Sequence, residues 1–193
     1  MLQSLNPLQT LVLNVLLAIY FIFPAYVANA TPVIGGGGAL IDGGKILSDG
    51  EPLFGPGKTI RGLIVGIFMG TLTATIQALV HPYLLDFIST LTILTPSELD
   101  LLQTSSLLGL MMSTGALTGD LLGSFIKRRL KLPRGRPAPP LDQLDFLAGA
   151  LCITYLVHPL HPFHLLILLV LTPLIHFIAN IFGYILKFKK EPW

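Results

Sequence analysis

Long apolar stretches separated by short polar ones run along the whole chain. A helix needs about 20 apolar residues to cross the hydrocarbon core of a bilayer. Five stretches are candidates for such helices: Leu8–Ala30, Ile60–Val80, Leu99–Thr118, Leu144–Val157 and Phe163–Leu186. The fourth is short and carries Asp145 in its first turn. Another apolar segment, Tyr83–Thr95, is also short and contains Asp86, so we expect it at the interface or partly inserted.

The first apolar stretch has a competing interpretation as a secretory signal peptide, because Ala28-Asn29-Ala30 resembles a cleavage site. Signal peptides carry basic residues before an apolar core of about 7–15 residues. Here no Lys or Arg precedes the apolar run, and the run is longer than such a core. We therefore expect a membrane helix that is retained.

Composition supports the same class of protein. The chain of 193 residues is 52% hydrophobic and only 11% charged, whereas soluble domains contain about 25% charged residues. The pattern predicts an integral membrane protein that is all-α, with residues 1–193 forming a single transmembrane domain.

The positions of the basic residues predict the orientation. All twelve Lys and Arg follow the first, third or fifth predicted helix: Lys45, Lys58 and Arg61; Lys127, Arg128, Arg129, Lys131, Arg134 and Arg136; Lys187, Lys189 and Lys190. Positively charged loops stay in the cytoplasm. Five transmembrane helices, with the N-terminus outside and the C-terminus cytoplasmic, place every basic segment on one side. The predicted cytoplasmic loops are about 31–61 and 119–143.

The first cytoplasmic loop is rich in glycine and ends in "GPGKTIRG", residues 55–62. A P-loop is excluded, because Pro52 stands where that motif needs its first glycine. The segment does open a helix, and helix starts offer free N–H groups to phosphate oxygens. Lys58 and Arg61, three residues apart, are expected on one face of the first turn.

Other residues of this segment are candidate phosphate ligands as well. Gly55 and Gly57 would let the backbone approach a phosphate, and Thr59 could cap the helix or contact a phosphate or metal. The alternative interpretation is a basic juxtamembrane anchor for lipid headgroups.

The second loop, "GDLLGSFIKRRLKLPRGRPAPPLDQ", brings acidic and basic residues to the ends of two membrane helices. Asp120 ends the third predicted helix, and Asp142 and Asp145 share one face at the start of the fourth. Ionisable groups at membrane depth are costly and usually functional. Carboxylates suit Mg²⁺, which is typically held by a few of them together with substrate phosphates. The alternative is that these acids form salt bridges with neighbouring Lys and Arg.

Between those acids, Ser124, Lys127 and Arg128 follow Asp120 at helical spacing. One loop therefore has the residues to hold phosphates and the other the residues to hold a metal. Together they predict a nucleotide–metal site at the cytoplasmic surface of the cell membrane.

These segments resemble the CDP-diacylglycerol synthases. "GPGKTIRG" is similar to their S-P-x-K-T-x-x-G element, and "GDLLGSFIKRRL…LDQLD" to G-D-L-x-x-S-x-x-K-R followed by L-D-R-x-D. The single apolar stretch before the glycine loop and the "VANATPVIGGGGALIDGG" run look more like the archaeal branch of the family, the CDP-archaeol synthases. Two departures stand out: "GRPAPP" replaces P-G-H-G-G, and an acid that follows the basic residues in the family is absent.

The resemblance implies a Mg²⁺-dependent cytidylyltransferase. Such an enzyme transfers a cytidylyl group from CTP to a lipid phosphate, here an isoprenoid ether glycerol phosphate, and acts on no nucleic acid. Asp120 and Asp145 would be the metal-associated acids with Asp142 beside them. Lys58, Thr59 and Arg61 would contact the nucleotide, and Ser124, Lys127 and Arg128 would complete the site.

Two other functions compete with this one. A CTP-dependent polyprenol or phytol kinase would use a similar placement and metal but release CDP. A transporter would place its charges near the bilayer midplane, whereas here they gather at one face. Gly62, Gly66 and Gly70 predict a close packing face on the second helix; whether it packs within one chain or in a homodimer stays open. His158, His161 and His164 are expected at the outer interface, not in a metal site.

Overall fold

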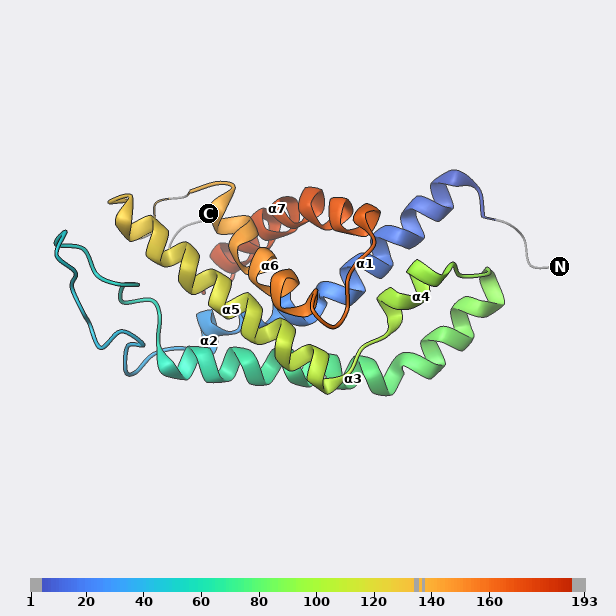
Figure 1. The fold of residues 1–193 in the computed structure, drawn as a ribbon, viewed down its shortest axis with the longest axis horizontal. Coiled ribbons are helices and arrows are strands. Elements are labelled where there is room, and N and C mark those ends of the chain that lie inside the picture. Colours follow the sequence, from blue (N-terminus) through green and yellow to red (C-terminus); the bar gives the residue numbers. More distant parts are fainter. Residues whose placement is uncertain (1–4, 134–135, 137, 189–193) are drawn as a thin grey trace.

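The chain folds into helices joined by short connections and one long glycine-rich segment. The computed structural model describes residues 5–133, 136 and 138–188. Its seven helices are α1 (Pro7–Ala30), α2 (Pro32–Gly35), α3 (Ile60–Leu91), α4 (Pro96–Leu102), α5 (Ser106–Arg129), α6 (Leu141–Thr154) and α7 (Pro162–Ile185). Figure 1 shows an elongated bundle, with the glycine-rich segment at one end and the start of α1 at the other. Arg134, Lys189 and Lys190 lie outside the described residues.

Helix α1 forms the centre of the bundle. It begins with a capping box, in which the Asn6 side chain accepts from the Gln9 N–H and Gln9 reaches back to the Asn6 N–H. Ala18, Phe21 and Ile22 are fully buried, and α1 contacts every other helix. A helix so placed is part of the folded core.

The third predicted helix, Leu99–Thr118, is wrong in its boundaries. The structure has α4 and α5 instead, separated by a break at 103–105. Thr95 and Glu98 form a capping box that starts α4, and the Ser105 hydroxyl accepts from the Leu108 N–H to start α5. Two independent N-caps make two helices, because each satisfies N–H groups that a continuous helix would bond internally.

Helix α5 also runs further than expected. It ends at Arg129, so residues 119–129 of the predicted 119–143 loop are helical, and the connection to α6 covers only 130–140. The basic residues Lys127, Arg128 and Arg129 form its last turn, where cations favour the negative end of the helix dipole.

The expected separate segment Tyr83–Thr95 is instead a continuation of α3, which is helical through Leu91 despite Pro82. Proline removes a backbone hydrogen bond and bends a helix, and Figure 1 shows α3 turning in its last third. At 1.5 Å per residue, such a helix is about 48 Å long, more than the roughly 30 Å of a bilayer core.

Small residues let the helices approach closely. Gly66 and Gly70 face α1 and α5, since a Cβ on Gly70 would meet Ser113 and the Pro24 carbonyl, whereas Gly62 faces Pro32 of α2. This glycine face therefore packs within the chain. Helices α5 and α6 meet through Gly115, Gly119 and Gly149, whose positions leave no room for a Cβ.

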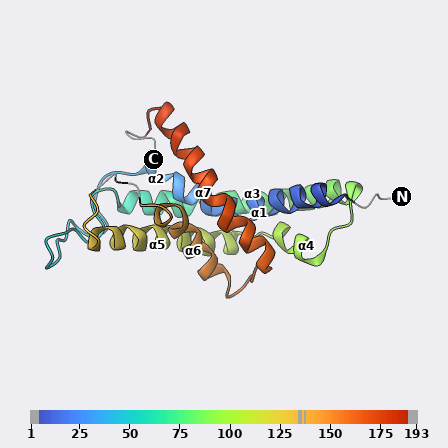
Figure 2. The same cartoon turned by 90° about the horizontal axis from the view of Figure 1, so that it is seen from above.

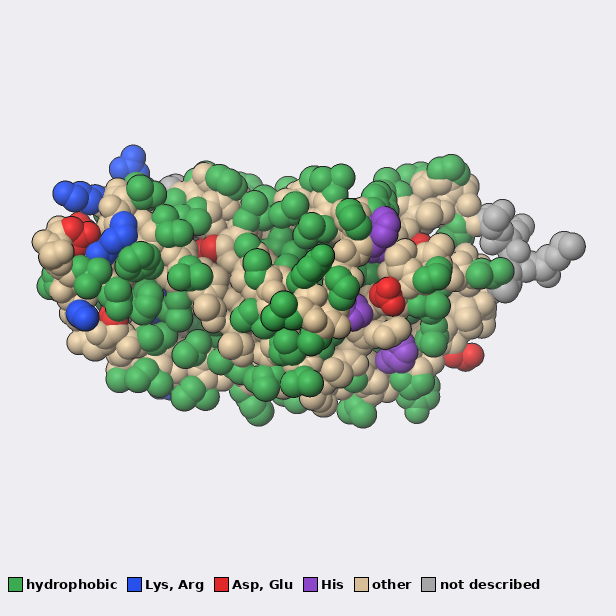
Figure 3. Space-filling view, in the orientation of Figure 1, with side chains coloured by type: hydrophobic (Ala, Val, Ile, Leu, Met, Phe, Trp, Pro, Cys, Tyr) green, Lys and Arg blue, Asp and Glu red, His purple; other side chains and the backbone are tan. Residues whose placement is uncertain are grey.

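Three described helical stretches are long and apolar enough to cross a membrane: Pro7–Gly35, Ile60–Leu91 and Pro162–Ile185. Helix α6 has only 14 residues, and α5 packs along it inside the bundle. Figure 3 shows hydrophobic side chains spread along the whole visible face, with Lys and Arg gathered at one end. The expectation of an all-α membrane protein is thus confirmed at that level. Figure 2 shows α7 crossing the bundle obliquely.

Candidate active site

The glycine-rich segment between α2 and α3 folds back on the end of the bundle. Isolated antiparallel bridges join Leu40 to Thr59 and Ile46 to Pro52. The first bridge holds the segment's two ends together, with the Ile41 N–H donating to the Lys58 carbonyl at 3.0 Å. Lys58 is therefore fixed by backbone pairing just before α3 begins.

Asp42 organises the base of this segment. Its carboxylate accepts from the backbone N–H groups of Gly44, Phe54 and Gly55, at 2.9, 3.0 and 3.3 Å. Partial burial raises the pKa of the Asp42 carboxyl, but these hydrogen bonds outweigh that effect, so its net pKa lies below the ordinary value. Gly55 has φ of 98°, a backbone conformation that favours glycine.

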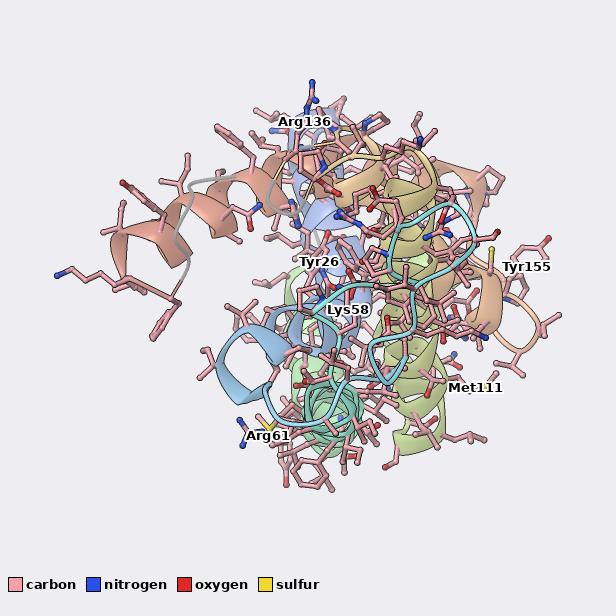
Figure 4. All side chains as sticks on the ribbon, turned by 90° about the vertical axis from the view of Figure 1, so that its left-hand side faces the viewer. Tyr26, Lys58, Arg61, Met111, Arg136 and Tyr155 are labelled. Atoms are coloured by element: carbon pink, nitrogen blue, oxygen red, sulfur yellow. The ribbon has the colours of Figure 1, made fainter. Side chains whose placement is uncertain are left out.

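The structure brings the two predicted segments together. The Lys58 ammonium lies 2.5 Å from the Asp120 carboxylate on α5, and both side chains are about three-quarters buried (24% and 22% exposed). In Figure 4, which looks onto this end of the bundle, Lys58 points toward the centre. A second pair joins Lys127 on α5 to Asp142 on α6, also at 2.5 Å.

Asp142 is fully engaged. One of its oxygens accepts from Lys127, and the other accepts from the Ala138 N–H at 2.8 Å. For Asp120 and Asp142, the alternative interpretation as salt-bridged acids therefore describes the structure.

Asp145 is the exception among the three acids. Its Oδ1 accepts from the Phe146 N–H at 2.6 Å, while its buried Oδ2 has no partner among the described residues. This carboxylate lies against Gly123, where a Cβ would overlap it. Asp120, Lys58 and Lys127 are all close enough to interact with it electrostatically. An unpartnered buried carboxylate oxygen is costly, and such groups are typical of functional sites.

The predicted acidic trio does not form a ready-made metal cage. Among the described residues, no three Asp, Glu, His or Cys side chains gather closely enough to hold a metal ion. Mg²⁺ commonly takes only one or two carboxylates and completes its shell with water and substrate phosphates. The free oxygen of Asp145, with Asp120 nearby, fits that kind of site better than the engaged Asp142.

The remaining predicted residues fall in different places. The Thr59 hydroxyl accepts from the N–H groups of Gly62 and Gly37, both at 3.1 Å, and so caps α3. Arg61 does not share a face with Lys58: it donates to the carbonyls of Gly35 and Gly36 and points away in Figure 4.

Exposure to solvent differs among three further predicted residues, Ser124, Gly55 and Gly57. Ser124 is buried in α5, at 5% exposure, and Gly55 is buried next to Arg128. Gly57 is exposed. The Arg128 Nε is buried and has no hydrogen-bond partner among the described residues. It is thus, like the Asp145 Oδ2, an unsatisfied polar atom.

Arg129 and Asp42 are the residues that sequence reasoning missed. Arg129 was one of three consecutive basic residues, with nothing to distinguish it. Asp42 precedes two glycines, a pattern typical of a turn stabilised by the aspartate side chain, and that signal could have identified it.

The opposite end of the bundle contains different features. An apolar groove of about 370 Å³ lies between α1 and α3, lined by residues such as Leu13, Leu17 and Phe87. These residues belong to the first half of α1 and the last part of α3, whereas Lys58 precedes the start of α3. His164 is buried at this opposite end, contrary to its expected interfacial position. Its Nε2 lies 2.6 Å from the Asn14 Oδ1, and Asn14 donates to Glu98. This network joins α1, α4 and α7.

The sequence matches a known family over nearly its full length. The family model described as "CarS-like: CDP-archaeol synthase" matches residues 10–193. Proteins named CDP-archaeol synthase are similar: that of Pyrococcus furiosus is 48% identical over 93% of this chain and 98% of its own length. That of Thermococcus gammatolerans is 47% identical over 91% and 95%, and that of Methanocaldococcus jannaschii 44% over 91% and 96%.

A solved structure has the same fold. It is described as an intramembrane enzyme for archaeal membrane lipid biosynthesis, and it superposes with a TM-score of 0.70 at 39% identity. The match covers 85% of this chain and 92% of the other.

Proposed function

The chain belongs to the CDP-archaeol synthase family, and from this membership we propose how its residues form CDP-archaeol. The family reaction is the CTP-dependent transfer of a cytidylyl group to an archaeal lipid phosphate. A polyprenol kinase and a transporter, the two competing functions, are set aside by the family match.

The observation that carries the proposed site is the meeting of Lys58, Asp120 and Asp145. These residues come from the end of the glycine-rich segment, from α5 and from α6, yet they lie together at one end of the bundle. A soluble triphosphate can reach this end, while the lipid phosphate approaches from the membrane surface.

The chemistry requires positioning and charge stabilisation. An oxygen of the lipid phosphate attacks the α-phosphorus of CTP, the bond from that phosphorus to the α–β bridging oxygen breaks, and pyrophosphate leaves. No protein nucleophile is needed, because the attacking oxygen is already anionic; holding the reactants in line supplies much of the rate. Lys58, Lys127 and Arg128 hold the phosphates and offset their charge.

Mg²⁺ would be held by Asp120 and Asp145 together with substrate phosphates. When bound, it would offset the charge that develops on the phosphate oxygens. Asp142, also a candidate metal ligand in the sequence, has both oxygens engaged. In this proposal it orients Lys127 from the start of α6.

We also propose that the chain crosses the membrane five times with this site on the cytoplasmic side. α1, α3 and α7 are each long and apolar enough to span, and α5 and α6 run along one another within the bundle. The supporting observation is the gathering of Lys and Arg at the end that bears Lys58, because positive segments stay in the cytoplasm.

Replacing the acids tests the site. We expect Asp120→Asn and Asp145→Asn each to lower the rate of CDP-lipid formation by about a hundredfold or more, since each removes charge from the transfer centre. The measurement is release of pyrophosphate from CTP with purified protein, an archaeal lipid phosphate and Mg²⁺. Asp86→Asn, on the exposed far part of α3, is the matched control and should retain activity. Near-normal turnover in both variants would overturn the assignment.

A further inference from the structure

Arg129, the last residue of α5, reaches across to a turn of the glycine-rich segment. Its guanidinium Nη1 lies 3.1 Å from the Asp49 carboxylate, and its Nη2 donates to the carbonyls of Glu51 and Pro52, at 3.3 and 2.6 Å. The same group lies over the Phe125 ring, 5.1 Å from its centroid. A planar guanidinium with several donors and a stacking face suits such a multiple contact, whereas lysine does not.

The turn that Arg129 holds has its own internal structure. Residues 45–53 form a hairpin, in which the Leu47 N–H donates to Glu51 and the Leu53 N–H to Lys45, both at 2.9 Å. Among the described residues, Arg129 makes all the side-chain hydrogen bonds that join this hairpin to the helices. A two-stranded hairpin is marginal by itself in water, so its position depends on this contact.

The hairpin leads directly to the site. Phe54 and Gly55 follow it and are bound by Asp42, and Lys58 comes three residues later, where its N–H donates to the Gly55 carbonyl. Arg129 also lies on the helix that carries Asp120. The contact thus ties the segment that presents Lys58 to the helix that presents Asp120.

We infer that Arg129 is a positioning residue that docks the 45–53 hairpin on the end of α5 and so places Lys58 opposite Asp120. Its terminal nitrogens are bonded to the hairpin, which distinguishes it from Lys127 and Arg128, the basic residues proposed to hold phosphates. This inference rests on the proposed function, because that function gives Lys58 its role in binding the nucleotide. The docking of the hairpin on α5 can be measured without an activity assay.

The test compares Arg129→Ala, Arg129→Lys, Asp49→Asn and the double variant Arg129→Ala/Asp49→Asn. We expect Arg129→Ala to raise the KM for CTP about tenfold or more, since bonds to a charged group are lost. The KM for the lipid phosphate should change less. Lysine should restore only part of the loss, and Asp49→Asn should add little when Arg129 is already absent. Arg136→Ala, an exposed arginine of the next connection, is the charge-matched control.

Hydrogen exchange gives the readout independent of catalysis. Backbone amides of 45–55 should exchange faster in Arg129→Ala and Asp49→Asn than in the parent or in Arg136→Ala. If Arg129 instead binds the triphosphate directly, exchange there will be unchanged, and the effects of Arg129→Ala and Asp49→Asn on KM will add. That result overturns the docking role.

A covalent tether further distinguishes docking of the hairpin by Arg129 from direct binding of the triphosphate by Arg129. In a Cys152→Ser background, Asp49→Cys and Arg129→Cys would be joined by a short bifunctional thiol reagent. Docking predicts that the tether restores the KM for CTP, and failure to restore it in tethered, folded protein contradicts docking. An inactive parent protein would instead count against the proposed function, while the exchange data would still judge the docking.

Discussion

The two lysine–aspartate pairs at the site keep some contact with solvent, because their side chains are 18–25% exposed. A mostly buried ion pair gains little net stability, since the cost of desolvating its charges offsets much of their attraction. A triphosphate carries several negative charges, so it can compete with Asp120 for Lys58. Asp145 differs because its buried Oδ2 has no hydrogen-bond partner among the described residues. The ion pairs therefore keep the lysines in place until a phosphate arrives.

We predict that Lys58→Ala raises the KM for CTP more than the KM for the lipid phosphate. The alanine removes a cation that the backbone pairing with Ile41 places at the nucleotide end of the site. Loss of a charged contact of this kind commonly costs tenfold or more. Steady-state kinetics with each substrate varied in turn measure the two constants.

Lys45→Ala serves as the control for that experiment, because Lys45 is an exposed lysine of the same segment. A larger change in the KM for the lipid would reassign Lys58 to the lipid phosphate.

At the scale of elements, the pairing of α5 with α6 fixes the geometry of the acids. Gly119 lies against the backbone carbonyl of Asp145, and Gly115 lies against Gly149. Close approach of two backbones is possible only where side chains are absent, a pattern common in membrane helix pairs. Asp120 and Asp145 are therefore brought near one another by the close packing of Gly119 on α5 against Asp145 and Gly149 on α6.

We expect Gly119→Ala to destabilise the bundle by about 1–3 kcal/mol, because an added methyl overpacks a filled interface. The melting temperature in detergent should fall by several degrees. Activity should fall as well, since the displaced backbone belongs to Asp145. Thr118→Ala, at the exposed neighbouring position of the same turn, should leave both nearly unchanged. Equal melting temperatures for the two variants would contradict this tight interface.

At the scale of the whole molecule, the two ends of the bundle differ in chemical character. Lys and Arg lie at the end that contains the glycine-rich segment, while the buried His164–Asn14–Glu98 network and the apolar groove lie toward the other. An enzyme that joins a soluble nucleotide to a membrane-held lipid needs such an arrangement, because one substrate stays in each phase.

Cysteine labelling of intact and inverted vesicles tests the orientation. In the Cys152→Ser background, a cysteine at Lys131, after α5, should react with an impermeant maleimide only in inverted vesicles. A cysteine at Ile93, exposed between α3 and α4, should react only in right-side-out vesicles. The reverse pattern, or labelling of both from one side, would exclude the proposed topology.

Much of the fold could be predicted from local features of the sequence. Helices α1, α6 and α7 begin and end within a few residues of their predicted positions, because apolar length and capping residues act locally. The break between α4 and α5 was missed although Ser105, whose hydroxyl caps α5, is a residue type that favours helix starts. The continuation of α3 past Pro82 was missed for another reason: the packing of the surrounding helices overrides the local effect of proline.

The sequence by itself determined the class of membrane protein, the clustering of charge after alternate helices, and the segments that meet at the site, because hydropathy and motif spacing are properties of the chain. Only the tertiary structure decided the pairings. Lys58 bonds to Asp120 while Arg61 turns to backbone carbonyls, and Asp145 keeps a free oxygen while Asp142 does not. These outcomes depend on which helices approach within a few ångströms, which is set by packing between residues far apart in sequence.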